Sequence, residues 1–435
     1  MLISSEYVTL GHPDRLCDTI ASNLINKIQK NDKENSHAAV EVFASDDTVV
    51  FGGEVKTSLK INKKLLREVL EESFKDCGYI PERRNVFTKD EVYLAKDTKI
   101  LNKVHAQSPD IARATTDKKE QSGFNDQGIF FGSYDYLTPT GQGVAKFLAQ
   151  SFGDFLFNKS KENLCIGSDI KVVFTLNVDD KDTYTPKSIK HVTVAIPNKN
   201  VDGSFKKDVS VQLYCSRHNH QIQDLQNVDA FVIKVYSMWQ DSLISQLNES
   251  YPLLVELLHG DFPEFTVNGT GRYVNHGYHS DASMTGRKLA VNNMSAGPVY
   301  SQCQCGGGSY IKPFHASDFL LPMAGNMIAK AVVSLGFTPY ANVALACTIG
   351  STKVDSICIT GNSKFNKNTK LVNTITEALK TLDISPDGLA KIWGYPKTFD
   401  FYSIAKSNFV DKNICPWYNT ESIEKFLSEA TKDLK

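Results

Sequence analysis

Residues 269–288 gather side chains that are suited to chemistry on an anionic substrate. They read GTGRYVNHGYHSDASMTGRK and combine four glycines, two histidines, one carboxylate and three permanent cations, Arg272, Arg287 and Lys288. Glycines let the backbone turn through positive φ and present its N–H groups to a ligand. Arginine binds phosphate oxygens in pairs, and lysine binds them as a point charge. The stretch therefore predicts a polyphosphate site, although the same composition is also typical of mobile surface loops.

Residues 11–15, which read GHPDR, predict a second place where an anion could bind. Apolar residues follow every four positions from Leu16 to Ile28, and proline suits the first position of a helix. His12 and Asp14 are therefore expected at the positive end of a helix dipole. Asp14 can also be interpreted as an ordinary charge at a helix N-terminus.

Further candidate carboxylates lie in predicted strands. Residues 38–44 and 48–55 read as a β-hairpin that carries Glu41 and Glu54, which either face solvent or hold a cation. Asp169 and Lys171 begin a strand over 170–178 and, being two residues apart, are expected on one face of it. They could form a salt-bridged pair, or act as one hydrogen-bond acceptor and one phosphate-binding cation.

A long polar connection, residues 107–128, leads into the apolar stretch IFFG at 129–132. Such a connection inside a compact chain is either disordered or a lid that closes over a site. Asp126 is expected where this polar loop becomes a buried strand.

Composition excludes several classes of partner. The 435 residues carry 48 Lys and Arg against 49 Asp and Glu, so bulk charge favours neither nucleic acid nor an acidic membrane. No apolar run is long enough to span a membrane, and the first residues lack the pattern of a signal peptide. The nine cysteines are odd in number and scattered, which indicates reduced thiols in a cytoplasm.

The predicted elements occur in blocks of strands and blocks of helices, which favours an α+β fold over strict βαβ alternation. The length predicts about three domains, and the absence of a Pro- or Ser-rich linker predicts that they are entwined. Strands are expected at 170–178, 189–196, 209–215, 343–348 and 356–360, and helices at 16–28, 66–74, 144–157, 317–335, 368–381, 420–433 and through most of 224–259.

Seven short motifs fall in one order along the chain: GHPD at 11–14, GGE at 52–54, QSPDI at 107–111, DQG at 126–128, TGR at 270–272, TGRK at 285–288 and GGG at 306–308. In these motifs the sequence closely resembles the S-adenosylmethionine synthetase (methionine adenosyltransferase) family. The resemblance covers most of the chain and fades in 180–260 and after 360.

The resemblance implies an α+β subunit of three entwined domains with pseudo-threefold symmetry. These would be residues 1–15 with 130–260, residues 16–129, and residues 261–435, with 107–128 as a mobile active-site loop. It also implies a homodimer or homotetramer with sites between subunits, two Mg²⁺ per site and one K⁺. The substrates would be ATP and L-methionine. The methionine sulfur would attack C5′ of ATP, and the released triphosphate would be hydrolysed to phosphate and diphosphate.

This chemistry suits the residues present. A thioether is a neutral nucleophile that needs no general base, so the lack of an acid–base pair is no objection. The leaving triphosphate gathers negative charge, which cations and metal ions must stabilise.

The resemblance assigns roles to individual residues. Catalytic roles fall on His12, Asp126, Lys171, Arg287 and Lys288. ATP contacts fall on His12, Asp169, Lys171, Arg272, Tyr273, Asp281, Arg287, Lys288, Ser309 and Lys312. Methionine contacts fall on Glu54, Gln107, Asp126, Asp281 and Ile349. The metal ligands are Asp14 and Asp318 for Mg²⁺ and Glu41 for K⁺.

The chain departs from the family at several of these motifs. Tyr273 stands where the family has phenylalanine, and Arg15 where it has lysine. Ala316 and Phe319 replace a lysine and an arginine, so two cations expected near the triphosphate are missing. This loss motivates one alternative, a non-catalytic, nucleotide-binding member that acts as a regulatory or structural partner. A third possibility is a triphosphatase that does not alkylate methionine.

Overall fold

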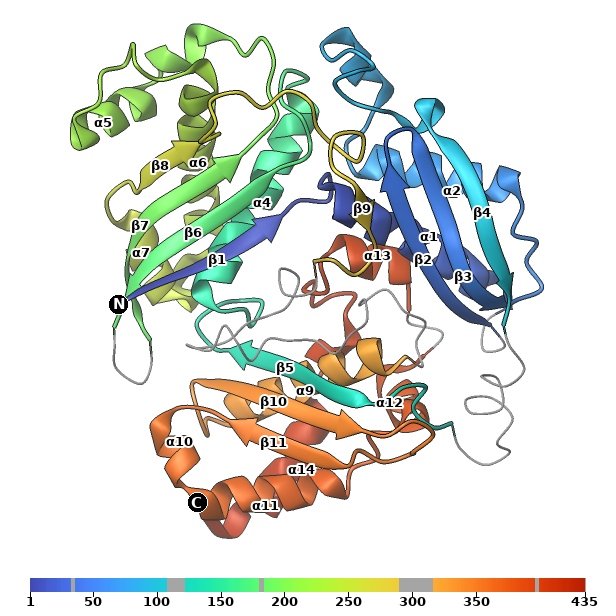
Figure 1. The fold of residues 1–435 in the computed structure, drawn as a ribbon. Coiled ribbons are helices and arrows are strands. Elements are labelled where there is room, and N and C mark those ends of the chain that lie inside the picture. The colour runs from blue at the N-terminus through green and yellow to red at the C-terminus, as the bar shows by residue number, and fades with distance from the viewer. Residues whose placement is uncertain (33–35, 108–121, 180–183, 289–315, 396–398, 435) are drawn as a thin grey trace.

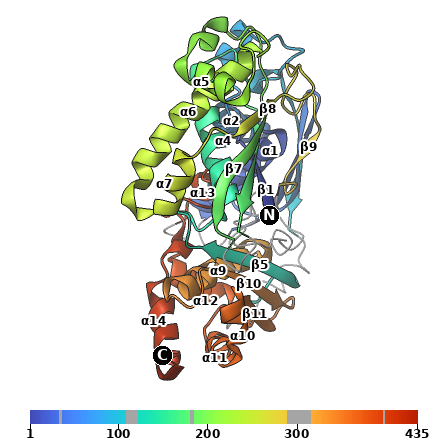
Figure 2. The same cartoon turned by 90° about the vertical axis from the view of Figure 1, so that its left-hand side faces the viewer.

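The computed structural model describes residues 1–32, 36–107, 122–179, 184–288, 316–395 and 399–434. These residues form three separate β-sheets, each with helices packed on one face (Figure 1). In the view of Figure 2, helices α6 (Asn227–Leu247) and α7 (Pro252–His259) lie on one side of the first sheet. The expected α+β class is confirmed.

The first sheet has the strand order β1-β6-β7-β8 and is antiparallel except for its last pair. Helix α4 (Val144–Glu162) and helix α6 cover it, and aromatic rings fill the space between. Phe152 of α4 lies 5.2 Å from Trp239 of α6, measured between ring centroids. The strands are β1 (Leu2–Val8), β6 (Lys171–Val178), β7 (Pro186–Ala195) and β8 (Glu264–Val267).

The second sheet has the order β4-β3-β2-β9 and confirms the predicted hairpin of β2 with β3. Helices α1 (Pro13–Asp32) and α2 (Lys63–Asp76) cover one face, where alternate side chains such as Val40, Val42 and Phe51 are buried. The strands are β2 (His37–Ser45), β3 (Thr48–Lys56), β4 (Lys99–Ala106) and β9 (Ser283–Met284).

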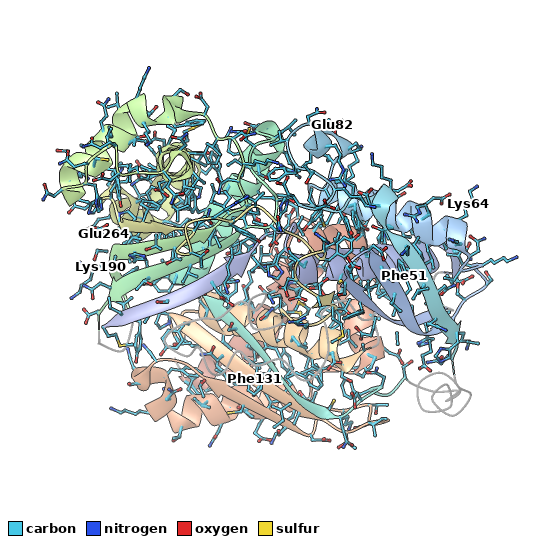
Figure 3. The ribbon with its side chains drawn as sticks, turned by 45° about the horizontal axis from the view of Figure 1, so that its top comes forward. Phe51, Lys64, Glu82, Phe131, Lys190 and Glu264 are labelled. Atoms are coloured by element: carbon cyan, nitrogen blue, oxygen red, sulfur yellow. The ribbon has the colours of Figure 1, made fainter. Side chains whose placement is uncertain are left out.

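The third sheet has the order β11-β10-β5, with helix α9 (Ser317–Ser334) packed closely on it. A Cβ on Gly132 would lie 2.2 Å from the backbone nitrogen of Asn326, so glycine is what allows this close approach. The strands are β5 (Gly128–Asp135), β10 (Tyr340–Cys347) and β11 (Ser356–Thr360). Figure 3 labels Phe131 on this sheet, Phe51 on the second, and Lys190 and Glu264 on the first.

The remaining helices are short or follow the third sheet. They are α5 (Val209–His218), α10 (Ser363–Lys367), α11 (Thr369–Lys380), α12 (Pro386–Trp393), α13 (Phe401–Lys406) and α14 (Glu421–Ala430). The 3₁₀ turns are Pro81–Asn85, Ala95–Asp97, Gly203–Lys207, Asn248–Ser250, Pro416–Tyr418 and Lys432–Leu434. No helix in the described part of the chain has both the length and the apolar character that crossing a membrane requires.

The prediction of a strand over 209–215 was wrong, because these residues form helix α5. The alternating valines suggested a strand, but Asp208 caps a helix by accepting the N–H of Ser210 at 2.9 Å. The buried side chains Val211, Tyr214 and Cys215 have the spacing of one helical face. Local capping and packing therefore override the β propensity of valine.

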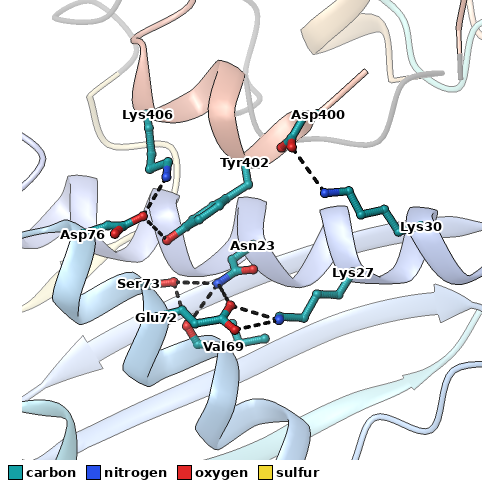
Figure 4. A network of polar contacts seen from close by, with 10 residues as sticks. All are labelled: Asn23, Lys27, Lys30, Val69, Glu72, Ser73, Asp76, Asp400, Tyr402 and Lys406. Atoms are coloured by element: carbon teal, nitrogen blue, oxygen red, sulfur yellow. Dashed lines mark hydrogen bonds and ion pairs between the residues drawn. The ribbon is translucent and has the colours of Figure 1, made fainter. Parts of the chain in front are cut away.

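Helix α13 links the second and third sheets. It follows the strands of the third sheet in the sequence, but it packs against α1 and α2, which cover the second sheet (Figure 4). Asp76 of α2 accepts hydrogen bonds from Tyr402 Oη at 3.0 Å and Lys406 Nζ at 2.6 Å. A second link, Lys30 to Asp400 at 3.2 Å, is more exposed.

Replacing Asp76 with alanine is expected to lower the free energy of unfolding by about 1–2 kcal/mol, because two partly buried donors lose their acceptor. Lys30→Ala, which removes the more exposed ion pair, is the control and should cost less than about 1 kcal/mol. Urea unfolding midpoints measure both. Equal effects of the two variants would contradict a special role for Asp76.

Candidate active site

Asp14 lies where the two predicted anion sites meet. Its side chain is buried in the first turn of α1, with 1% of the residue exposed. Oδ1 accepts the N–H of Met284 at 3.0 Å, and Oδ2 receives Lys288 Nζ at 2.6 Å. Arg287 Nε lies 3.7 Å from Oδ1. The fold thus brings residues 11–15 and 269–288 together, which neither stretch could predict alone.

The turn that carries these cations is held by hydrogen bonds to α1 and β2. Strand β9 pairs with β2, and the N–H of Thr285 donates to Val42 O at 3.0 Å. Thr285 Oγ1 donates to Glu41 Oε2, and the N–H of Gly286 donates to Asp18 Oδ1 at 3.0 Å. Gly286 takes a φ of 77°, which favours glycine. The turn is therefore held in shape before any ligand binds.

Asp18 is a site residue that sequence reasoning missed. Its spacing of four from Asp14 places both carboxylates on one face of α1, a signal that could have found it. Burial raises the pKa of Asp18 to about 7, and nearby Arg15 opposes the shift. Its visible role is to hold the backbone of Gly286.

His12 is a neutral ring whose remaining polar group is a hydrogen-bond donor. Its Nδ1 accepts the N–H of Asp14 at 3.2 Å, so the neutral ring carries its proton on Nε2. Burial, together with the charge of Lys288, lowers the pKa of His12 to about 3. The ring therefore stays neutral at physiological pH, and Nε2–H is its donor.

Asp169 and Lys171 were expected to form a salt bridge or to act separately. They do not pair with each other, so the salt-bridge interpretation is wrong. Asp169 Oδ2 accepts Tyr273 Oη–H at 2.8 Å and the N–H of Gly277 at 3.1 Å. Burial raises the pKa of Asp169 to about 6. Lys171 instead contacts Glu6 at 2.5 Å.

The predicted methionine contacts are spread over several elements. Glu54 lies on β3 beside β4, and Gln107 follows β4, where its N–H donates to Val55 O at 3.0 Å. Gln107 Oε1 is buried and has no hydrogen-bond partner among the described residues. Asp126 is exposed, and its Oδ1 accepts the N–H of Gln127 at 2.8 Å. Ile349 is half exposed after β10.

The other predicted contacts are exposed or lie outside the described residues. Arg272 and Asp281 are exposed on the loop that precedes β9. Ser309, Lys312, the glycines 306–308 and most of the predicted loop, 108–121, fall outside the described ranges.

Ala316 and Phe319, which replace two cations of the family, both face the protein interior at the start of α9. Ala316 is buried just before the helix, and Phe319 is fully buried. The Phe319 ring lies 5.5 Å from Phe401 and 6.0 Å from Trp417, within a larger aromatic cluster. Position 319 is therefore part of the core here, while Asp318 lies in the first turn of α9 and is half-buried.

The carboxylates that the structure describes at the candidate site are few, which suits a Mg²⁺ ion whose other ligands come mainly from the substrate. Within the described ranges, no three His, Cys, Asp or Glu side chains gather as a metal cage. Mg²⁺ is commonly bound by one or two carboxylates, with phosphate oxygens and water completing its shell. Asp14 suits this role, because its carboxylate lies beside cations that attract the same phosphates.

The fold and the candidate site together define an α+β protein in which two cations, Arg287 and Lys288, lie beside Asp14 at the N-terminus of α1. Two family models match the sequence: "S-adenosylmethionine synthetase, N-terminal domain" at residues 1–109 and "S-adenosylmethionine synthetase, C-terminal domain" at residues 275–419. Together they cover more than half of the chain, which therefore belongs to the S-adenosylmethionine synthetase family. The resemblance seen in the motifs is confirmed, and with it the enzyme class, methionine adenosyltransferase.

Two known proteins are similar over nearly the whole length. An S-adenosylmethionine synthase of Mycoplasma mycoides subsp. mycoides is 26% identical over 429 residues, 97% of this chain and 96% of the relative. An unusual S-adenosylmethionine synthetase from Campylobacter jejuni has a similar structure, with a TM-score of 0.77 and 25% identity over 98% of this chain and 99% of its own. At these identities the chain is a divergent member.

Proposed function

We propose that this chain makes S-adenosylmethionine from ATP and L-methionine. A lone pair of the methionine sulfur forms the bond to C5′, and the C5′–O bond breaks with its electron pair leaving on the triphosphate. The triphosphate is then hydrolysed to phosphate and diphosphate. The observation that carries the proposal is the contact of the buried Asp14 carboxylate with Lys288 and, at 3.7 Å, with the more exposed Arg287 at the N-terminus of α1.

The charges at this place suit a polyanionic leaving group. Lys288 and Arg287 supply fixed positive charge, and the neutral His12 ring supplies a hydrogen-bond donor. The start of α1 adds the positive end of a helix dipole. Hydrogen bonds to Asp18 and Glu41 already hold the turn at 285–286. Little reorganisation of this turn is therefore needed when charge develops on the triphosphate.

The remaining residues are proposed to bind the two substrates. Asp169, Lys171, Arg272, Tyr273 and Asp281, with Ser309 and Lys312, would contact ATP. Glu54, Gln107, Asp126, Asp281 and Ile349 would contact methionine. Oε1 of Gln107 is buried and has no hydrogen-bond partner within the described part of the chain, which supports its role because such an atom suits the amine of a ligand.

Metal ions are proposed at the carboxylates named above. Asp14 and Asp318 would hold Mg²⁺, and Glu41 would hold K⁺. Mg²⁺ bound there would neutralise charge on the triphosphate oxygens.

The subunit is proposed to work as a homodimer or homotetramer through its open sheet faces. Across the second sheet the strand register places Met284, Phe43, Val50 and Leu101 in one row, on the face away from α1 and α2. Phe43, Leu101 and Met284 are 43%, 48% and 44% exposed, an apolar row that a second copy would cover. Glu41 and Glu54 lie on the same open face, so the interface would complete the site.

Phe43→Asp is expected to produce a monomer with little synthetase activity. A twofold interface would bury the new charge twice, which should weaken association by about 10³-fold or more. Leu213→Asp, also 43% exposed but on α5, is the matched control and should leave both properties unchanged. Light scattering measures the mass; a dimeric Phe43→Asp variant would exclude this face.

The domain division and the location follow from the same proposal. The first sheet would centre domain 1–15 with 130–260, the second 16–129 and the third 261–435. Three strands pair outside the sheet that would centre their range: β5 lies in the third sheet, β8 in the first and β9 in the second. The proposed ranges therefore interleave at these strands. The free thiols among the described cysteines support a cytoplasmic location.

The missing cations at 316 and 319 motivate one alternative, a nucleotide-binding partner without turnover. A triphosphatase that does not alkylate methionine is a third possibility. The purified protein should be tested in three reactions: ATP with methionine, ATP alone and inorganic tripolyphosphate alone, each with Mg²⁺ and K⁺. Sulfonium product in the first supports the synthetase. Phosphate from tripolyphosphate without any sulfonium indicates the triphosphatase, and ATP binding without turnover indicates the partner protein.

A further inference from the structure

The side chain of Tyr273, which stands where the family has phenylalanine, makes a contact through its hydroxyl that a phenylalanine could not make. Its hydroxyl donates to Asp169 Oδ2 at 2.8 Å, and the N–H of Gly277 donates to the same oxygen at 3.1 Å. Asp169 is 7% exposed. A phenylalanine in place of Tyr273 would keep the ring but lose this contact.

The geometry leaves the other carboxylate oxygen for a ligand. Among the described residues, both hydrogen bonds that Asp169 accepts end on Oδ2. An ionised carboxylate only accepts hydrogen bonds, so its ligand partner must be a donor. A triphosphate at neutral pH is essentially all acceptor, whereas adenosine offers ribose hydroxyls and an amino group. Oδ1 of Asp169 therefore suits the adenosine end of ATP.

We propose that Tyr273 is a positioning residue: its hydroxyl donates to Asp169 and so presents that side chain as a carboxylate, which accepts a hydrogen bond from the adenosine moiety of ATP. This inference rests on the proposed use of ATP as substrate. It makes ATP recognition in this chain depend on a hydroxyl group that does not touch the reacting atoms.

The charges around Asp169 explain why the hydroxyl matters. Burial and the like charges of Asp281 and Asp14 raise the pKa of Asp169, while Gly277 N–H and the Tyr273 hydroxyl lower it. Buried Tyr79 lies beside the carboxylate and carries no charge near neutral pH, because burial raises the pKa of its hydroxyl. The balance leaves the pKa of Asp169 at about 6. Without the tyrosine hydroxyl one of the two hydrogen bonds that lower this pKa is lost, so we expect a higher pKa for Asp169 and a larger protonated fraction near neutral pH.

Tyr273→Phe tests the proposal by the pH dependence of the KM for ATP, expressed as the ratio of variant to wild type. At pH 6.5–7 the expected ratio is about ten, which corresponds to one hydrogen bond to a charged group. The ratio should fall toward one as the pH approaches 9, since the carboxyl is then ionised in both proteins. The KM for inorganic tripolyphosphate, which has no adenosine, should not change.

Two further variants make the result decisive. Tyr278→Phe removes another buried tyrosine hydroxyl of the same segment, bonded to Thr98 at 2.6 Å, and should leave the KM for ATP unchanged at every pH. Asp169→Asn should weaken ATP binding at all pH values, because its side chain cannot regain the charge.

A ratio for Tyr273→Phe that is one throughout, or that is raised equally at pH 6.5 and 9, would overturn the proposal. If the wild-type protein binds ATP but makes no sulfonium, the proposed function fails instead. The same pH comparison by calorimetric ATP binding then still supports or overturns the role of Tyr273.

Discussion

Asp14→Asn is expected to lower kcat for S-adenosylmethionine formation by about 10³-fold or more and to leave the fold intact. Asparagine keeps an oxygen for the N–H of Met284, so the backbone contact to β9 survives. The charge that pairs with Lys288 at 2.6 Å is lost, and with it the proposed Mg²⁺ ligand. The triphosphate would then leave from a site with misplaced cations and weaker metal binding.

Initial rates at saturating ATP and methionine measure this effect, and circular dichroism checks the fold. Asp208→Asn is a matched control, because Asp208 also lies at a helix N-terminus, where its side chain accepts the N–H of Ser210. It should leave kcat unchanged, since asparagine caps helices about as well as aspartate. An Asp14→Asn enzyme with wild-type kcat would remove Asp14 from the catalytic account.

Phe319→Arg is expected to destabilise the protein by more than about 4 kcal/mol rather than to restore a missing cation. Phe319 is fully buried against Phe401, Phe409 and Trp417. A guanidinium there would lose its water without gaining a carboxylate, and the aromatic cluster would lose a ring.

Urea unfolding and soluble yield measure this loss, with Phe319→Leu as the control. Leucine keeps an apolar side chain and should cost much less, about 1–2 kcal/mol. A Phe319→Arg protein that is as stable as wild type and hydrolyses tripolyphosphate faster would show that position 319 reaches the site.

The sequence predicted those parts of the fold that carry strong local patterns. Helix α1 follows from an apolar residue every four positions after Pro13, and the hairpin of β2 and β3 follows from two β-rich runs around a short turn. The strand prediction for residues 209–215 was wrong because alternating valines resemble a strand. The cap at Asp208 and the buried helical face of Val211, Tyr214 and Cys215 decide the structure instead.

The site could be predicted only in pieces. Glycine and cation content pointed to residues 269–288, but nothing local predicts that Lys288 contacts Asp14, which lies 274 positions earlier. That contact depends on β9, a strand of two residues that no periodicity could reveal. The inward direction of Phe319 and the hydroxyl contact of Tyr273 likewise follow from tertiary packing.

Product stoichiometry is the most direct test of the proposed synthesis of S-adenosylmethionine from ATP and methionine. Purified protein is incubated with ATP, methionine, Mg²⁺ and K⁺, and S-adenosylmethionine is quantified by mass spectrometry beside phosphate and diphosphate. One phosphate and one diphosphate are expected for each sulfonium formed. Folded protein that binds ATP yet forms no sulfonium would contradict the proposed synthesis.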